Sequence, residues 1–116
     1  MESSVVAPAI VIVVTDECSE QWRDVLLGIE EEGIPFQLKP ITGSDVTDAS
    51  YLAAQQSPLL VGMACNREQL VIHYKNLMPA SPLFQLSKPL TQPVDVLRSL
   101  GNNAARLVKG LPFKPL

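Results

Sequence analysis

The stretch AIVIVV at residues 9–14 decides which class of fold this sequence can adopt. It is apolar and mostly β-branched, which is typical of a strand buried on both faces, as in a parallel sheet. A polar turn at residues 15–18 separates it from a segment whose apolar side chains recur at helical spacing: Trp22, Val25, Leu26 and Ile29. The sequence therefore predicts a buried strand followed by a helix over residues 19–32, with Ser19 as its N-cap.

The rest of the chain continues this alternation of strands and helices. Gly33 and Gly110 are placed to end helices, and Gly62 inside an apolar strand indicates close approach of another backbone. The other predicted strands are 36–41, 59–65, 70–74 and 83–86, and the other predicted helices are 48–56 and 94–109. This order predicts an α/β fold: a three-layer sandwich resembling an anticodon-binding domain, in which helices cover both faces of a four- to five-stranded mixed, mostly parallel sheet.

Length and composition predict one domain over residues 1–116, with a Pro-rich tail at 111–116. The chain is 47% hydrophobic and 18% charged, as expected of a globular protein. Its net charge of −3 conceals an asymmetry. Residues 1–48 hold ten acidic and two basic residues, a net charge of −8, whereas residues 49–116 hold two acidic and seven basic residues, a net charge of +5.

Several classes of protein are excluded or disfavoured by what the sequence lacks. The longest nearly apolar run, residues 5–14, is shorter than the roughly 20 residues of a membrane helix, and it lacks the pattern of a signal peptide. We therefore expect a cytoplasmic protein. In that compartment Cys18 and Cys65 are expected to be two inert thiols, although one bridge between them stays open. The known nucleotide, zinc and hydrolase motifs are absent, and the pI near 5.0 disfavours nucleic acid.

Three consecutive carboxylates, Glu30, Glu31 and Glu32, form the most informative local feature. They fall in the last turn of the first helix, at the negative end of its dipole, where acidic residues are unfavourable. One interpretation is a solvated charge run. The other is that something cationic meets this end, either a divalent ion or a basic partner surface, since carboxylates suit Mg²⁺ or Ca²⁺. One helical turn cannot complete a coordination shell, so further ligands would have to come from another chain.

The final predicted helix has small and amide residues in its middle, at Gly101, Asn102 and Asn103. They indicate either close approach of another surface or a kinked surface helix. Arg106 and Lys109 suit the end of the helix dipole and are expected to need no partner. Trp22 is expected in the core, with an interface anchor as the alternative. His73, the only histidine, is expected to be a hydrogen-bonded structural residue.

Four stretches in combination resemble a known family. They are LLGIEEEGIPF (26–36), SPLLVGMAC (57–65), HYKNL (73–77) and GNNAARLVKGLPF (101–113). Over nearly the whole chain the sequence is similar to the small subunit of the diol/glycerol dehydratase reactivating factor. The dehydratase medium subunit is the nearest confusable family, but it is longer and carries an N-terminal extension.

The resemblance implies a non-catalytic subunit that works with a large, chaperone-like ATPase subunit, which binds the ATP or ADP. The pair releases damaged cobalamin from inactivated adenosylcobalamin-dependent dehydratase, with the small subunit exchanging for the dehydratase medium subunit. The resemblance also implies a Mg²⁺ at the interface with the large subunit, with Glu31 as one ligand. It implies a heterotetramer of two large and two small subunits. Glu30, Glu32, Trp22, Asn102, Asn103 and Arg106 are the candidate interface residues.

Two other functions are less favoured by the residues. A free-standing domain that binds cobalamin or a nucleotide would use the carboxyl edge of the sheet, but the sequence lacks both a Gly-rich phosphate loop and a DxHxxG motif. An enzyme using Cys65 or His73 is the least favoured alternative. The sequence distinguishes neither the propanediol from the glycerol pathway nor free protein from protein enclosed in a bacterial microcompartment.

Overall fold

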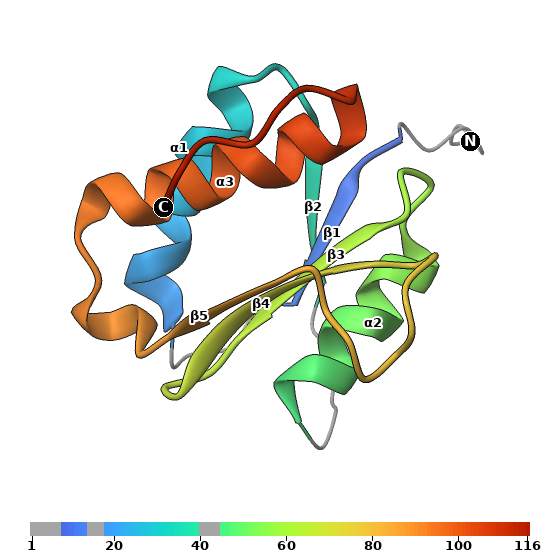
Figure 1. Cartoon of the computed structure of the whole chain (residues 1–116), viewed down its shortest axis with the longest axis horizontal. Coiled ribbons are helices and arrows are strands. Elements are labelled where there is room, and N and C mark those ends of the chain that lie inside the picture. The colour runs from blue at the N-terminus through green and yellow to red at the C-terminus, as the bar shows by residue number, and fades with distance from the viewer. Residues whose placement is uncertain (1–7, 14–17, 40–44) are drawn as a thin grey trace, which may run out of the picture.

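The computed structural model describes residues 8–13, 18–39 and 45–116, and its elements alternate as the sequence predicts. The strands are β1 (Ile10–Val13), β2 (Phe36–Lys39), β3 (Val61–Cys65), β4 (Gln69–Tyr74) and β5 (Phe84–Ser87). The helices are α1 (Ser19–Glu31), α2 (Val46–Gln56) and α3 (Val94–Lys109), with a 3₁₀ turn, η2 (Pro89–Thr91), before α3 (Figure 1). The predicted bounds of α3 are therefore confirmed.

The five strands form one mixed sheet in the order β2-β1-β3-β4-β5. β1 pairs in parallel with both β2 and β3, whereas β4 pairs antiparallel with β3 and with β5. Four strands thus run in one direction and only β4 runs against them. The mixed, mostly parallel sheet is confirmed, and the break in the pattern falls at the predicted strand 70–74.

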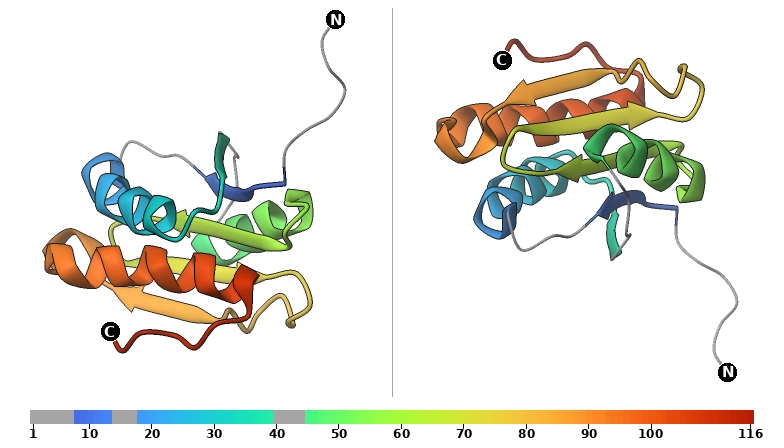
Figure 2. Two further views of the ribbon diagram at one scale, coloured as in Figure 1. Left: turned by 90° about the horizontal axis from the view of Figure 1, so that it is seen from above. Right: turned by 90° about the horizontal axis from the view of Figure 1, so that it is seen from below.

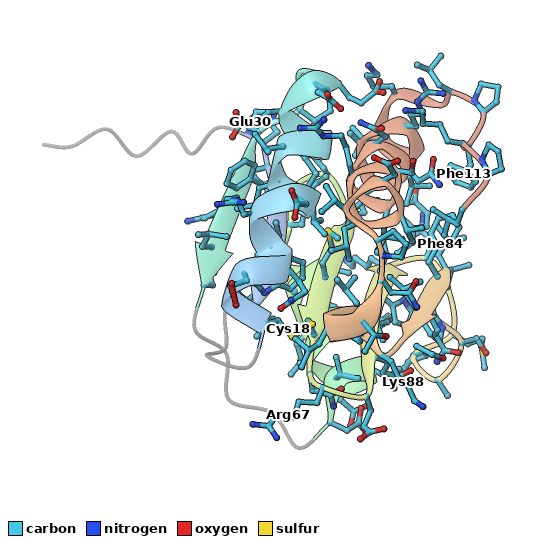
Figure 3. The ribbon with its side chains drawn as sticks, turned by 90° about the vertical axis from the view of Figure 1, so that its left-hand side faces the viewer. Cys18, Glu30, Arg67, Phe84, Lys88 and Phe113 are labelled. Carbon is cyan, nitrogen blue, oxygen red and sulfur yellow. A yellow bond between two sulfur atoms is a disulfide. The ribbon has the colours of Figure 1, made fainter. Side chains whose placement is uncertain are left out.

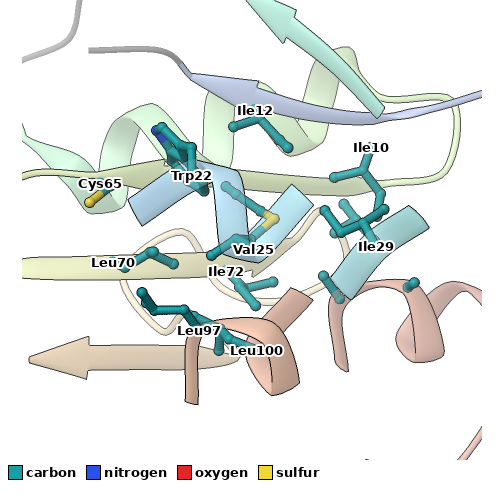
Figure 4. Close-up of a cluster of buried hydrophobic side chains, with 14 of the residues drawn as sticks. Ile10, Ile12, Trp22, Val25, Ile29, Cys65, Leu70, Ile72, Leu97 and Leu100 are labelled. Carbon is teal, nitrogen blue, oxygen red and sulfur yellow. The ribbon is translucent and has the colours of Figure 1, made fainter. Parts of the chain in front are cut away.

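Helices cover both faces of the sheet, which confirms the three layers (Figure 2). The alternation of side chains along β1 shows how this is achieved, because Ile10 and Ile12 face α1 and α3 whereas Val11 and Val13 face α2. The larger core lies on the α1 and α3 side, where the helices pack on the apolar side chains of β3 and β4 (Figure 4). Both faces of β1 are thus buried, as its continuous apolar run predicts.

The beginning of α2 differs from the expected one. Helix α2 begins at Val46 and its N-cap is Asp45, whose carboxylate accepts a 2.9 Å hydrogen bond from the backbone N–H of Asp48. The predicted helix 48–56 therefore began two residues too late. A local signal for the earlier start exists in the sequence, because Asp is a favoured N-cap residue.

Glycines allow the helices to lie close to their neighbours at two places. A Cβ on Gly62 of β3 would overlap the backbone of α2 at Ser50 and Ala54, so the close approach predicted for this strand is confirmed. Where α1 crosses α3, a Cβ on Gly28 would overlap the carbonyl oxygen of Arg98, and one on Gly101 would overlap that of Val25. The surface that approaches the middle of α3 is therefore α1 of the same chain.

The expectation of two separate thiols is wrong for this structure, because Cys18 and Cys65 form a disulfide. Cys18 immediately precedes α1 and Cys65 ends β3, and the packing of α1 on the sheet leaves their Cα atoms 6.2 Å apart. That separation lies within the range of about 4.4–6.8 Å that a disulfide spans. The expectation rested on the redox state of a compartment, which carries no information about this proximity.

Among residues 8–13, 18–39 and 45–116, no helix combines the length and apolar character needed to cross a membrane.

Candidate functional site

The acidic end of α1 lies beside the second half of α3, and the two helices make the most extensive helix–helix contact of the described chain. This packing brings the acidic part of the sequence, at residues 30–32, against the basic side chains of residues 98–109. Acidic residues of the first half and basic residues of the second half therefore pair with each other within one molecule at this place.

Glu32 is paired inside the chain. Its carboxylate accepts hydrogen bonds from Arg106 Nε at 3.0 Å and from Lys109 Nζ at 2.8 Å, and its side chain is only 12% exposed. The bond from Lys109 and then that from Arg106 hold the pKa of Glu32 below its ordinary value. The expectation that Arg106 and Lys109 need no partner is wrong, because the α1–α3 crossing places their side chains at the end of α1.

Glu31 is held less tightly and remains accessible. Its Oε1 accepts a 3.2 Å hydrogen bond from Asn102 Nδ2, and its Oε2 lies 3.7 Å from Arg98 Nε. The Glu31 side chain is 49% exposed, about four times the fraction of Glu32. Glu31 is thus held by a neighbouring side chain and is still accessible to another molecule.

Glu30 projects from the exposed side of the same helical turn (Figure 3). The three consecutive carboxylates therefore have three different surroundings, although the sequence shows them as one cluster. The helical period separates them, with Glu32 turned toward α3, Glu31 at the margin and Glu30 in solvent.

Asn102 and Asn103 are buried, at 1% and 0% exposure, and each side-chain amide makes hydrogen bonds through both its NH₂ group and its oxygen. Asn102 Nδ2 also donates to the backbone oxygen of Gly28 at 2.7 Å, and its Oδ1 accepts from Lys114 Nζ at 2.8 Å. Asn103 accepts from the backbone N–H of Lys114 at 2.6 Å and donates to the carbonyl of the same residue at 2.9 Å. The amides therefore join α3 to α1 and to residues 111–116.

Residues 111–116 run back along α3. Arg106 Nη1 donates to the carbonyl of Pro112 at 3.2 Å, and the rings of Phe113 and Phe84 on β5 pack edge to face with 5.1 Å between centroids (Figure 3). The segment thus has both polar and apolar anchors, although it forms no helix or strand.

The described side chains offer a cation few ligands. Within the described part of the chain, no three His, Cys, Asp or Glu side chains come together as a metal site. Glu31 offers an exposed carboxylate, which is the hard oxygen ligand that Mg²⁺ prefers. Glu31 could therefore fill only one position of a coordination shell, and the remaining ligands would have to come from another molecule.

Two candidate residues lie away from this site. Trp22, on α1, is 4% exposed and its side chain packs in the core between α1 and the sheet, as its helical spacing predicts (Figure 4). His73 is fully buried, and its Nδ1 accepts from the backbone N–H of Tyr74 at 2.9 Å while its Nε2–H donates to the carbonyl of Pro79 at 2.9 Å. The structural role predicted for His73 is confirmed.

A shallow surface hollow lies between the first turns of α1 and α3, at the other end of these helices from Glu31. Its lining is mixed in charge and mostly polar: Glu20, Gln21, Arg23, Asp24, Gln92, Val94 and Leu97. The hollow lies toward the carboxyl edge of the sheet, where the small-molecule alternative would place its pocket, because Cys18 before α1 is bonded to Cys65 at the carboxyl end of β3.

The sequence-based reasoning missed three residues of the site, namely Arg98, Lys109 and Lys114. Complementary charge could have indicated Arg98 and Lys109. Three acidic residues end the predicted helix 19–32, and both basic residues lie on the predicted helix 94–109. Nothing local to Lys114 indicated its contact with a buried asparagine.

The comparisons with known proteins agree over almost the whole chain. A family model described as the dehydratase medium subunit matches residues 7–114. The propanediol dehydratase-reactivating factor small subunit of Citrobacter freundii is 57% identical over 114 residues, which are 98% of this chain and 97% of that protein. The protein of the same name from Salmonella typhimurium is 54% identical over 116 residues, which are 100% of this chain and 98% of that protein.

Solved structures agree in fold as well as in sequence. A chain of the diol dehydratase-reactivating factor complexed with ADP and Mg²⁺ is 55% identical with a TM-score of 0.86, and the match covers 95% of this chain and 100% of that one. A chain of a glycerol dehydratase reactivase is 29% identical with a TM-score of 0.85, covering 93% of this chain and 97% of that one.

Proposed function

Because this chain belongs to the dehydratase medium subunit family and, within it, to the small subunits of dehydratase-reactivating factors, we propose that it is the small subunit of such a factor. The factor restores adenosylcobalamin-dependent diol or glycerol dehydratase by releasing the damaged cobalamin. The observation that carries this proposal is the agreement of sequence and fold with reactivating-factor small subunits over nearly the full length of both chains.

The chain contributes shape and contacts, and the chemistry of ATP belongs to a large partner subunit. The described side chains support this division, since the only histidine is used in structural hydrogen bonds and the cysteines are joined to each other. The related reactivating-factor structure contains ADP and Mg²⁺, as expected of a complex that uses a nucleotide.

Exchange with the dehydratase's own medium subunit follows from the shared family. The match of residues 7–114 to the family model of the medium subunit supports this exchange, because chains of one family share a fold and this chain could therefore take the place of the medium subunit. Occupation of that place by the small subunit would separate the dehydratase subunits that enclose the cofactor, and the damaged cobalamin would then leave.

The contact with the large subunit is centred on the exposed part of the acidic turn. Glu31 fits one coordination position of a Mg²⁺ that the large subunit shares, and Glu30 lies beside it in solvent. When bound, the ion would join carboxylates of the two subunits. Glu32 and Arg106 are already paired with each other, so their part is to hold the end of α1 in place. We propose a heterotetramer of two large and two small subunits.

The proposal is tested by purifying the tagged chain together with a co-expressed large subunit in buffer containing Mg²⁺ and ADP. We expect a stable complex that dissociates when the metal is chelated, and we expect Glu31→Gln to weaken it. Glu20→Gln is the matched control, because Glu20 is an exposed acidic residue at the other end of α1. Failure of the chain to associate with the large subunit at all would overturn the proposal.

A further inference from the structure

We infer that Asn102 and Lys114 position the Glu31 carboxylate, so that residues 111–116 are a working part of the metal contact. This inference rests on the proposed function, because it takes Glu31 as the residue that meets the cation. It adds two residues of the same chain that hold Glu31 without touching the ion.

The amide of Asn102 has one defined orientation. Its NH₂ group meets two acceptors, the backbone oxygen of Gly28 at 2.7 Å and Glu31 Oε1 at 3.2 Å. Its oxygen meets a donor, the ammonium of Lys114 at 2.8 Å. A flipped amide would place its oxygen against two acceptors and its NH₂ against an ammonium group, so all three contacts select the same orientation. Asn102 itself is 1% exposed, so water has little access to its amide.

Lys114 is brought to this amide by its own backbone. Asn103 binds both the N–H and the carbonyl of Lys114, at 2.6 Å and 2.9 Å, and the preceding Phe113 packs against Phe84. The side chain of Lys114 makes a separate contact, with Asn102. Removing the ammonium therefore leaves the anchors of the segment in place, which makes Lys114 a clean position for a test.

The consequence for Glu31 is a carboxylate held from inside the molecule and open on the outside. Asn102 fixes Oε1, Arg98 lies 3.7 Å from Oε2, and half of the side chain faces solvent. Carboxylates that bind metals are generally held in this way by neighbouring hydrogen bonds, and loss of such a neighbour weakens metal binding by about 10- to 100-fold. Lys114 acts one step further away, through the orientation of Asn102.

The test measures the Mg²⁺ concentration at which the full-length chain associates half-maximally with the large subunit in the presence of ADP. We expect Lys114→Met to raise that concentration by about tenfold, the lower end of the range for such neighbours. Lys114→Arg, which keeps a cationic donor, is expected to restore most of the response. Lys75→Met is the matched control, since it removes one charge from an exposed lysine elsewhere and should leave the response unchanged.

Two further readouts separate the possible failures. Glu31→Gln should remove the Mg²⁺ dependence; if it does not, the proposed metal ligand is wrong and this inference fails with it. If Glu31→Gln acts as expected but Lys114→Met matches the wild type, only the inference is overturned.

The second readout is the NMR spectrum. The side-chain amide resonances of Asn102 should shift in Lys114→Met with the unfolding midpoint unchanged. Unshifted resonances would show that the Lys114–Asn102 contact is absent, which also overturns the inference.

Discussion

Glu32 and Lys109 lie 77 residues apart in the sequence, yet the Lys109 ammonium donates to both the carboxylate and the backbone oxygen of Glu32, at 2.8 Å and 2.9 Å. The pair closes the last turn of α1 against the last turn of α3. Three acidic residues at a helix C-terminus are unfavourable by themselves. The Lys109 ammonium offsets both the charge of the Glu32 carboxylate and the negative end of the helix dipole.

Replacement of Glu32 by Gln is expected to lower the free energy of unfolding by about 1 kcal/mol at neutral pH, since two charge-assisted hydrogen bonds are weakened. The loss should depend on pH. The pKa of Glu32 is lowered in the folded chain, so its stabilisation is complete above the unfolded pKa and disappears as the pH falls through the folded one. Urea unfolding at pH 7 and at progressively lower pH measures this. An unchanged difference between variant and wild type in acid would contradict the assignment, and Glu30→Gln is the control.

Replacement of Gly101 by Ala tests the crossing of α1 and α3. In an exposed helix this change would be favourable by about 1 kcal/mol. Here a Cβ would overlap the carbonyl oxygen of Val25, so we expect a net loss of roughly 1–3 kcal/mol in the free energy of unfolding. Ser99→Ala, on the same helix, should change stability little. Stabilisation by Gly101→Ala would mean that the two helices do not approach this closely.

Replacement of Asn103 by Ala should release residues 111–116 from α3. The backbone N–H of Lys114 donates to Asn103 Oδ1 at 2.6 Å, so its hydrogen exchange should be slow in the wild type and fast in the variant. The N–H of Leu111, which donates to the carbonyl of Arg106 at 3.0 Å, should stay protected and serves as an internal control. Equal exchange of Lys114 in both proteins would show that the amide does not anchor the segment.

Reduction of the Cys18–Cys65 disulfide should destabilise the purified, oxidised protein by roughly 3–4 kcal/mol, because the bond closes a long loop in the unfolded chain. Urea unfolding with and without a reducing agent measures the difference. A double replacement by Ala should be insensitive to the reducing agent. If the purified protein contains two free thiols under oxidising conditions, the bond is not formed.

The sequence predicted the features that depend on local pattern. The buried run around Ile10–Val13 identified a central strand, and the apolar spacing of Val94–Lys109 identified α3, because the side-chain period of an element shows within a few residues. Gly33 and Gly110 ended the helices before them, and both have the positive φ, +76° and +71°, that favours glycine there.

The missed features all depend on how distant elements pack. The Cys18–Cys65 bond joins the start of a helix to the end of a strand, and the Glu32–Lys109 pair forms only when α1 crosses α3. The contact of Lys114 with Asn102 requires the segment after α3 to turn back along it. Such contacts follow from tertiary geometry and leave no periodic signal in the sequence. The resemblance to reactivating-factor subunits came instead from motifs spread over the whole chain.

The central claim, that this chain is the small subunit of a dehydratase-reactivating factor, is tested most directly by release of cobalamin. Inactivated dehydratase with its damaged cobalamin still bound is incubated with ATP, Mg²⁺ and the large subunit, with or without this chain, and the free cobalamin is measured by its absorbance after filtration. The account predicts release only when both subunits are present. Release by the large subunit alone at the same rate, or no release with both, would contradict it.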